Sequence, residues 1–371
     1  MTQHQPLRAL GLMSGTSLDG IDAAIITSDG YRLIETGGIT GASYDADFRA
    51  RLRGCLGLKA DAPGVAAVAR ELTLRHADVV ARLLKDNDLT PDDIDLIGFH
   101  GHTTLHRPEQ RLSVQIGYPA LLAEQTGITV VGDFRANDVA EGGQGAPLAP
   151  LFHVALTGDL AKPLAVLNVG GVANVTWIGQ IDQGSSPEDP EILAFDTGPG
   201  NALIDDWVAD AIARPMDEGG RLARGGTVDE RRLAALLDNP YFARIPPKSL
   251  DRDDFAEVMQ SVAGLSPADG AATLSAFSAA AVARAREHFP EPAKRWLVCG
   301  GGRLNGTLMA MMGKALAVPV DPIEAVGLNG DALEAQAFAF LAIRSFYGLP
   351  LSLPDTTGAP RPLSGGVLYA R

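Results

Sequence analysis

The stretch GLMSGTSLDGID, residues 11–22, combines small hydroxyl residues, glycines and two aspartates in front of an apolar run. Gly15 and Gly20 permit positive φ angles, so a tight turn here can direct several backbone N–H groups at one anion. The pattern indicates a nucleotide phosphate held by these amides, with Asp19 or Asp22 beside its metal ion. An ordinary β-hairpin turn explains the same residues and is compatible with that role. The residues we assign to nucleotide binding here are Gly15, Thr16, Ser17, Leu18, Asp19, Gly20, Ile21 and Asp22.

Further glycine loops follow apolar strand-like runs, in GFHGHTT, VGDFRANDVAEGGQGAPL, NVGGVAN, FDTGPGN and VCGGGRLN. In open α/β sheets, ligands bind at such loops. The phosphate-loop, dinucleotide, metalloprotease and serine-hydrolase signatures are all missing from the sequence. Paired glycine loops, one set in each half, therefore predict two segments that each hold part of a nucleotide. The second-half residues assigned to it are Asn168, Gly170, Gly171, Gly300, Gly301, Gly302 and Asn305.

Asp196, in AFDTGPGN, follows an apolar run and precedes a glycine turn. A carboxylate at that position faces the ligand side of an α/β sheet and can act as a general base. The simpler alternative is a helix N-cap or turn residue.

Asp133 and Arg135, in VGDFR, follow another apolar run; they bind sugar hydroxyls or pair with each other. Glu334 completes a capping pair with Asp331 at the start of a helix in NGDALEAQAFAFLAIRSFYG. The histidines make no zinc-like spacing with cysteines or carboxylates, so we expect no metal centre beyond the Mg²⁺ that accompanies ATP. These histidines are His100, His102, His106 and His153.

The elements that position these residues follow from hydrophobic periodicity. Residues 7–30 predict two strands joined by the glycine loop, 65–87 a helix, 95–108 a strand opening into a polar loop, 119–127 a helix and 128–134 a strand. From residue 164 the order recurs, with strands on either side of a glycine turn, a helix from residue 202 and a strand at 296–299. The sequence therefore predicts two copies of one βαβ-rich unit, with a boundary near residue 163.

Composition sets the class of protein. A length of 371 residues favours two domains, and 42 glycines with 46% hydrophobic residues fit an α/β fold. The net charge of −14 disfavours nucleic acid and anionic membrane surfaces as partners. Two distant cysteines, Cys55 and Cys299, suit a reducing compartment, and the first residues contain no apolar signal segment, so we expect a cytoplasmic protein.

The motifs SGTSLDGID, HGHT, PALLAEQTGITVVGDFR, GGQGAPL, LNVGG, FDTGPGN, VCGGG and DTTGAPRPLSGG span almost the whole chain. Together they resemble the anhydro-N-acetylmuramic acid kinase family, within the superfamily of sugar kinases, Hsp70 and actin. The resemblance implies an α/β, two-domain actin-like ATPase fold of duplicated βββαβαβα-type units around a nucleotide cleft. We expect lobes of residues 1–160, with the tail 348–371, and 161–347.

That family converts 1,6-anhydro-N-acetylmuramic acid, ATP and water to N-acetylmuramic acid 6-phosphate, in murein recycling. The resemblance implies Asp196 as the catalytic base, ATP with Mg²⁺, and a homodimer. It also implies a sugar site that contains His100, His102, Asp133, Arg135 and Glu334. One departure is His102, because the family motif HGQT is HGHT here. The alternatives are an ordinary hexose or amino-sugar kinase and a non-catalytic, nucleotide-gated sugar-binding protein.

Overall fold

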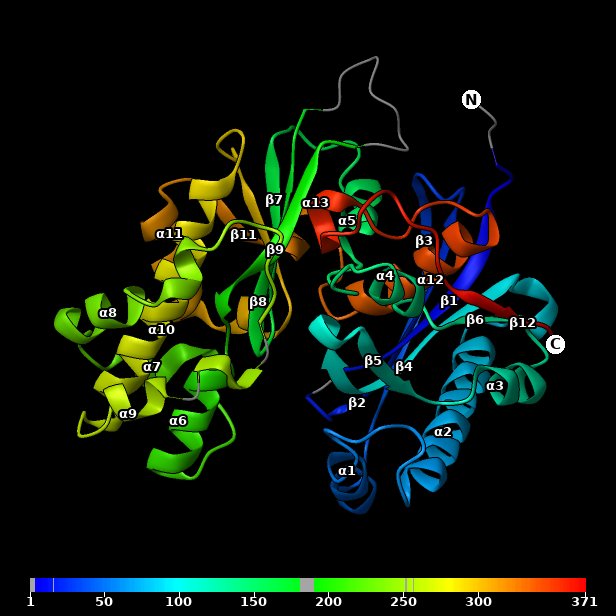
Figure 1. Cartoon of the computed structure of the whole chain (residues 1–371), viewed down its shortest axis with the longest axis horizontal. Coiled ribbons are helices and arrows are strands. Elements are labelled where there is room, and N and C mark those ends of the chain that lie inside the picture. Colours follow the sequence, from blue (N-terminus) through cyan, green and yellow to red (C-terminus); the bar gives the residue numbers. More distant parts are fainter. Residues whose placement is uncertain (1–3, 16, 181–189, 251, 256) are drawn as a thin grey trace. The chain divides into compact units, whose positions relative to one another are not determined.

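The structure is a computed structural model, and it describes residues 4–15, 17–180, 190–250, 252–255 and 257–371. These residues divide into two compact units, whose strands and helices are labelled in Figure 1. The described residues up to Asp159, together with Ala332–Arg371, form unit 1. The described residues from Leu160 to Asp331 form unit 2.

Unit 1 is built on a mixed sheet with the strand order β12-β6-β4-β1-β2-β3, and β5 pairs with β4. Strands β1, β4 and β6 are parallel, and the other pairs are antiparallel. The strands are β1 Leu7–Ser14, β2 Gly20–Ser28, β3 Leu33–Ser43, β4 Leu96–Arg107, β5 Leu112–Ile116, β6 Val130–Gly132 and β12 Val367–Tyr369. The helices are α1 Ala46–Arg53, α2 Val65–Asp86, α3 Pro119–Thr126, α4 Ala136–Ala140, α5 Pro150–Leu156, α12 Leu333–Phe346 and α13 Pro354–Thr357.

Unit 2 repeats the arrangement in a sheet with the order β11-β10-β7-β8-β9, in which β7, β10 and β11 are parallel. Its strands are β7 Leu164–Val169, β8 Val172–Ile178, β9 Ile192–Pro199, β10 Trp296–Cys299 and β11 Val320–Pro322. Its helices are α6 Ala202–Ile212, α7 Arg221–Arg224, α8 Glu230–Leu237, α9 Val258–Ser261, α10 Pro267–Ala285 and α11 Gly306–Leu316. Three antiparallel strands followed by helix-linked parallel strands occur twice, so the predicted duplication is confirmed.

Helix α12 packs against β1, β2 and β4 of unit 1, although it follows the strands of unit 2 in the sequence. The sequence predicts one lobe over residues 161–347, and the structure differs at this helix. The physical reason lies in β1 and β4, where Gly11 and Gly98 have no side chain. The backbone of α12 can therefore approach so closely that a Cβ at Gly98 would lie 2.0 Å from Phe338 O.

The opposite face of the unit 1 sheet carries a hydrophobic core of its own. Successive residues of a strand face opposite sides, so Leu10 and Leu12 of β1 point away from α12 and share a buried cluster with Leu72 and Val79 of α2. The 22-residue α2 has its apolar positions at helical spacing, as predicted, and it ends one residue earlier than expected. Unit 1 thus has helices on both faces of its sheet.

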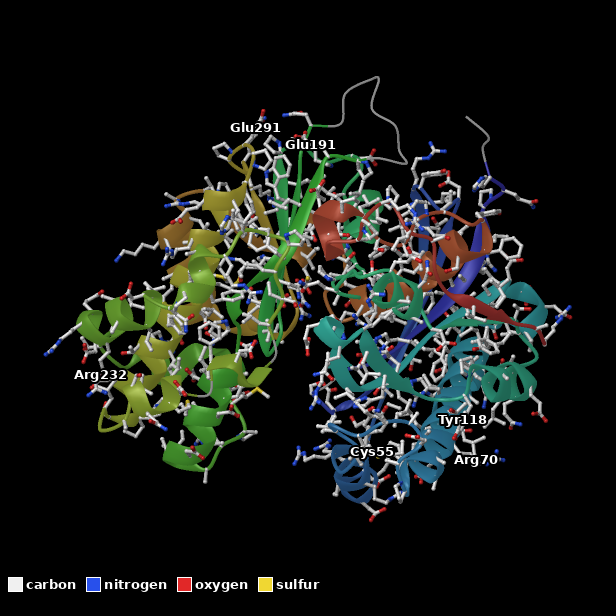
Figure 2. The ribbon with its side chains drawn as sticks, in the orientation of Figure 1. Cys55, Arg70, Tyr118, Glu191, Arg232 and Glu291 are labelled. Carbon is white, nitrogen blue, oxygen red and sulfur yellow. The ribbon has the colours of Figure 1, made fainter. Side chains whose placement is uncertain are left out.

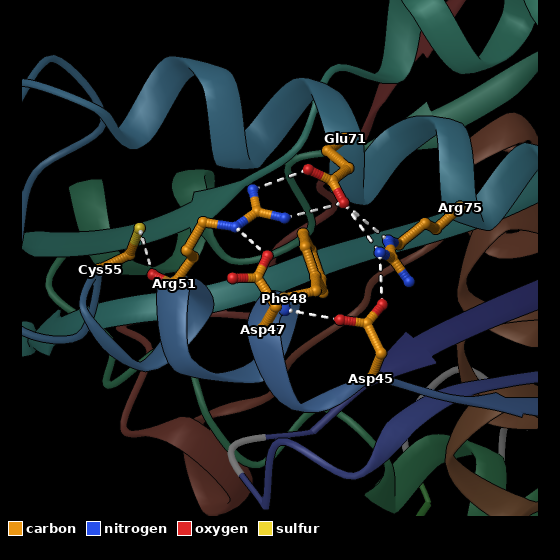
Figure 3. A network of polar contacts seen from close by, with 7 residues as sticks. All are labelled: Asp45, Asp47, Phe48, Arg51, Cys55, Glu71 and Arg75. Carbon is orange, nitrogen blue, oxygen red and sulfur yellow. Dashed lines mark hydrogen bonds and ion pairs between the residues drawn. The ribbon is translucent and has the colours of Figure 1, made fainter.

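A network of ion pairs fastens α1 to α2 beside this core (Figure 3). The Arg75 guanidinium lies 2.7 Å from the carboxylate of Asp45, the N-cap of α1, and 4.3 Å from the Phe48 ring centroid. The Arg51 guanidinium lies 2.7 Å from the Glu71 carboxylate. Exposed pairs of this kind contribute at most about 1 kcal/mol each. Their main consequence is a fixed α1, whose Phe48 packs on the ring of Tyr44.

In unit 2, helix α10 lies between two buried clusters. One face, with Ala279 and Val282, packs against the sheet. Another face, with Leu274 and Phe277, packs among the shorter helices, where Arg232 of α8, labelled in Figure 2, donates to the carbonyls of Ser261 and Ala263. The aromatic cluster around Phe277 includes Tyr241, Phe242 and Phe255, which come from the connection after α8.

Cys55, labelled in Figure 2, follows α1 in unit 1, and Cys299 ends β10 in unit 2; both are free and buried. The expectation that the strand within residues 95–108 opens into a polar loop is wrong, because β4 continues to Arg107 and pairs there with β5. Within the described residues, no helix combines the length and apolar character that crossing a membrane requires.

Candidate functional site

The glycine loop between β1 and β2 forms a hairpin turn in which Leu18 N–H donates to Gly15 O at 3.1 Å. Leu18 has the positive φ of 60°, so the expectation that Gly15 and Gly20 supply positive φ is wrong. Gly20 is required for another reason, because a Cβ there would lie 2.3 Å from Ala42 O on the neighbouring β3. Asp19 is exposed and its Oδ1 accepts from Ser17 Oγ at 2.7 Å.

The other assigned residues of this loop differ in exposure. Asp22 is exposed on β2, whereas Ile21 and Leu18 are buried in the unit 1 core, so only their backbones are available to a ligand. Thr16 lies outside the described residues. The loop therefore presents main-chain groups and the carboxylates of Asp19 and Asp22 together.

His102 is fully buried, and its Nδ1 lies 3.0 Å from Ser14 Oγ. Ser14 immediately precedes the glycine loop, and its hydroxyl also lies 2.7 Å from Tyr44 Oη. The backbone N–H of Tyr44 donates to Asp19 O at 2.9 Å, on the far side of the same loop. Burial lowers the pKa of His102 to about 4, so its imidazole is neutral. A sugar contact for His102 stays a prediction, and the contact that the structure shows for its Nδ1 is with Ser14, beside the glycine loop.

His102→Ala is therefore expected to weaken nucleotide binding about 3-fold to 10-fold, because Ser14 loses a buried hydrogen-bond partner beside the glycine loop. His102→Gln is the matched control, since an amide can still bond to Ser14. Calorimetric titration with a non-hydrolysable ATP analogue measures the effect. A His102→Ala protein that lost affinity for the sugar and kept its nucleotide affinity would contradict this role and support the predicted sugar contact.

His100, Arg135 and Glu334, three residues predicted to bind sugar, come together in unit 1. Arg135 Nε donates to His100 Nε2 at 3.1 Å, so His100 carries its proton on Nδ1, which donates to Gly101 O at 3.1 Å. Burial lowers the pKa of Arg135 to about 10, and the Glu334 carboxylate opposes that shift. The protein around the Glu334 carboxyl partly excludes water and so raises its pKa, while the positive charge of Arg135 acts in the opposite direction. Glu334 nevertheless remains exposed to solvent. The three side chains offer a cation, a carboxylate and a neutral imidazole to a polar ligand.

Asp133 is oriented differently. Its Oδ2 accepts from Tyr369 Oη of β12 at 2.6 Å, and this hydrogen bond raises the pKa of Tyr369 to about 12. Arg135 donates to Gly145 O at 2.7 Å in addition to His100. Asp133 and Arg135 therefore have separate partners, and the alternative in which they pair with each other is wrong.

The predicted capping pair at the start of α12 is also wrong. The N-cap is Ala332, and Asp331 instead lies 2.7 Å from the guanidinium of Arg303. Arg303, almost fully buried in unit 2, also pairs with Glu324 at 2.8 Å and donates to Gly300 O at 3.1 Å. The Arg303 guanidinium therefore holds the glycine loop that follows β10 in place. Because Asp331 pairs with Arg303 and Ala332 is the N-cap, Glu334 has no capping role.

Two glycine loops of unit 2 are joined by backbone hydrogen bonds where β7 ends and α6 begins. Gly200 N–H donates to Gly171 O at 2.8 Å, and Asn201 N–H donates to Gly170 O at 2.8 Å. A Cβ at Gly200 would lie 2.3 Å from Gly170 O, so only glycine permits this approach. Gly171 is exposed, which leaves its main chain accessible to a ligand.

The loop at residues 300–302, which follows β10, lies against Asn168 at the end of β7. A Cβ at Gly300, whose φ is 71°, would lie 2.3 Å from Asn168 Oδ1, and one at Gly302 would lie 2.3 Å from Val169 Cγ1. Gly301 is exposed beside them. The structure thus brings Asn168 and the predicted glycines of unit 2 together. Asn305 has a separate structural role as the N-cap of α11, accepting from Leu308 N–H at 3.0 Å.

Asp196 lies on β9, paired with Asn174 of β8, four residues before the joined glycine loops. Its Oδ2 accepts from Leu250 N–H at 2.7 Å, and its carbonyl accepts from Tyr241 Oη at 2.5 Å. The N-cap of α6 is Asn201, so the capping alternative for Asp196 is wrong. Burial raises the pKa of Asp196 to about 7, partly offset by the Leu250 hydrogen bond. A half-buried carboxylate with a pKa near neutrality has the properties of a general base.

Tyr241 and Leu250 were not predicted. They lie about fifty residues after Asp196 in a connection without strand or helix periodicity, and no local signal in the sequence points to them. Within the described ranges, no group of three or more His, Cys, Asp or Glu side chains is arranged to hold a metal ion. Exposed Asp19 and Asp22 fit the one or two carboxylates that usually accompany nucleotide-bound Mg²⁺.

Duplicated units with the same strand order, glycine loops after parallel strands and a half-buried carboxylate beside them define a two-domain α/β protein of the actin-like class. The sequence model of anhydro-N-acetylmuramic acid kinase matches residues 7–371. The chain belongs to this family, as the motifs predicted.

Curated relatives agree with the family model. Anhydro-N-acetylmuramic acid kinase of Rhodospirillum rubrum is 57% identical over 97% of this chain and 94% of its own length. The proteins of the same name from Paramagnetospirillum magneticum and Acidiphilium cryptum are 53% and 52% identical, over 96% and 97% of this chain and 98% and 97% of their own lengths.

Proposed function

We propose that the protein is an ATP-dependent kinase that phosphorylates O6 of 1,6-anhydro-N-acetylmuramic acid while water opens the anhydro ring, giving N-acetylmuramic acid 6-phosphate. Family membership supports the substrate. The observation that carries the chemistry is Asp196, a half-buried carboxylate on β9 with a pKa raised to about 7. The reaction belongs to murein recycling, and a cytoplasmic location and a homodimer are proposed with it.

The mechanism needs a base on one side of the sugar and a phosphoryl acceptor on the other. Asp196 removes a proton from water as the water oxygen attacks C1, as the base of an inverting glycosidase does. The C1–O6 bond breaks, and O6 forms its bond to the γ-phosphorus of ATP while the bond to ADP breaks. The charge that develops on O6 passes to the phosphoryl group, so a separate general acid is not required.

The glycine loops supply the positioning that phosphoryl transfer chiefly requires. We propose that the turn at residues 15–22 and the loops at Asn168, Gly171 and Gly301 bind ATP through main-chain groups, because these segments are accessible and fixed by hydrogen bonds. Mg²⁺ bound with ATP would neutralise charge on the phosphates, and Asp19 and Asp22 would hold it or its waters.

We further propose that His100, Arg135 and Glu334 bind the sugar. Arg135 is held by His100 and Gly145, so its guanidinium is pre-oriented for an acidic or hydroxyl group. The accessible Glu334 carboxylate accepts hydrogen bonds from sugar hydroxyls. Asp133 would bind the sugar through Oδ1, because Tyr369 already donates to its Oδ2.

Mass spectrometry of the product tests the function. With anhydro-N-acetylmuramic acid, ATP, Mg²⁺ and ¹⁸O-water, followed by immediate borohydride reduction to block exchange, we expect a phosphosugar that contains one added water with its label at C1. An ordinary kinase would leave the anhydro ring intact and give a product lighter by one water. A binding protein without catalysis would give no sugar-dependent consumption of ATP.

A further inference from the structure

The connection at residues 241–250 surrounds Asp196 with three hydrogen bonds. Asp196 N–H donates to Lys248 O at 3.0 Å, and Leu250 N–H donates to the Asp196 carboxylate at 2.7 Å. Tyr241 Oη donates to Asp196 O at 2.5 Å. Both the backbone of Asp196 and one carboxylate oxygen are therefore fixed by this single connection, which we call the 241–250 loop.

Lys248 holds the two ends of this loop together. Its ammonium lies 3.3 Å from Tyr241 O, 3.4 Å from Phe242 O and 3.4 Å from His288 Nε2. It also lies over the ring of Tyr241, 4.7 Å from the centroid, and 5.6 Å from that of Phe195, the residue before Asp196. The contacts close a ring from Asp196 through Tyr241 and Lys248 back to Asp196.

Burial of the Lys248 ammonium costs free energy, because the charge is removed from water. Lys248 is 4% exposed, and burial lowers its pKa to about 8, with Arg244 and Arg284 acting in the same direction and Glu287 against it. An apolar side chain would fill the same volume without the cost of removing a charge from water. What the ammonium adds is directional: it can donate to two carbonyls of the Tyr241–Phe242 turn at once.

We propose that Lys248 is a positioning residue for Asp196, which closes the 241–250 loop so that the Leu250 N–H stays directed at the Asp196 carboxylate. This inference rests on the proposed role of Asp196 as the base. Lys248 acts through the loop, whereas Asp196 itself meets the reacting water.

The consequence is a change in proton affinity that a purely structural lysine would not produce. The pKa of Asp196 is raised by burial and lowered by the Leu250 hydrogen bond. Around Lys248 the charged or titratable groups are Arg244, Arg284, Glu287 and His288, and Tyr241 faces the Asp196 main chain. When the loop opens, Asp196 loses the stabilising N–H, so its pKa rises and less carboxylate is present at a given pH.

Lys248→Met keeps the length and apolar stem of the side chain and removes the ammonium. We expect kcat to fall roughly 10-fold to 100-fold, as a misplaced catalytic group typically causes. The acid limb of the kcat profile should move to higher pH, and the KM for ATP should stay unchanged. Lys248→Arg, which retains a donor and a cation, should recover part of the activity.

Lys294→Met is the matched control, since the Lys294 ammonium donates to Lys162 O at 2.8 Å in the same unit but does not contact the 241–250 loop or Asp196. It should leave kcat and its pH profile at wild-type values. A Lys248→Met protein that melts lower and keeps the wild-type acid limb would overturn the proposal and leave a merely structural lysine.

Combination with Asp196→Asn separates the two hypotheses. If Lys248 acts through Asp196, Lys248→Met should cause no further loss of kcat in the Asp196→Asn background. An equal loss in both backgrounds would overturn the positioning role while leaving the base in place. Wild-type turnover in Asp196→Asn alone would instead refute the base, whatever Lys248 does.

Discussion

Asp196→Asn is expected to lower kcat by ~10²–10⁴-fold, the range that general-base catalysis typically contributes. Asparagine keeps the shape of the side chain, and its amide oxygen can still accept from Leu250 N–H, so the 241–250 loop should remain closed. It cannot take a proton from water at neutral pH. Because the lost interaction belongs to the transition state, the affinities for ATP and sugar should change much less than kcat.

Stability supplies an independent check on the same substitution. The folded-state pKa of Asp196 is raised from 3.8 to about 7, so the folded protein retains a proton that the unfolded chain has released. The free energy of unfolding of the wild type should therefore fall as pH rises through this window and level off above it. Asparagine does not titrate, so the Asn variant should gain in melting temperature relative to the wild type between about pH 4 and pH 7.

Thermal melting measured from about pH 4 to pH 9, with initial rates wherever the protein stays folded, covers both expectations. In the wild type, kcat should rise with pH through about 7 as Asp196 ionises, since the base acts in its deprotonated form. An Asp196→Asn protein with near-normal kcat and a lower melting temperature would assign Asp196 a structural role. The base would then have to be sought among Asp133, Asp19 and Asp22.

Local patterns in the sequence predicted most of the strands and glycine loops. The hairpin between β1 and β2, the helix α2 and the turn between β7 and β8 each have a periodicity or a glycine pair within a few residues. The role of each glycine was harder to predict, because a glycine can be required either for a positive φ angle or for the close approach of a neighbouring segment. Gly20 turned out to permit contact with β3, which depends on a strand that the sequence reading of residues 7–30 did not include.

The surroundings of Asp196 could not be predicted for a different reason. Tyr241, Lys248 and Leu250 reach it through hydrogen bonds across about fifty residues, and such bonds leave no periodic trace in the chain. His102 shows the same limit, because HGHT indicated a polar loop and gave no sign that β5 would cover it and turn the ring toward Ser14. Side chains on one strand can serve a ligand or the core, and tertiary packing decides which.

The position of α12 predicts that a side chain added at Gly98 will strongly lower the stability of unit 1. The helix was recognisable from its apolar pattern, but the sheet it covers was not. The partners that decide it are glycines at matching positions of β1 and β4, which pair Gly11 with Gly98. A Cβ at Gly11 would lie 1.8 Å from Ala335 O, and one at Gly98 would lie 2.0 Å from Phe338 O. Both obstacles are helix backbone, which cannot rotate away as a side chain can.

Gly98→Ala is therefore expected to destabilise unit 1 by about 3 kcal/mol or more, at the upper end of what overpacking a core costs. Denaturant unfolding followed by far-ultraviolet circular dichroism measures the loss. Gly313→Ala is the matched control: it adds the same methyl group within α11, where nothing lies within 4 Å, and should stabilise by about 0.5–1 kcal/mol. All three tryptophans, Trp177, Trp207 and Trp296, belong to unit 2, so fluorescence follows the control. A Gly98→Ala protein as stable as the wild type would mean that α12 does not lie on β4 at this distance.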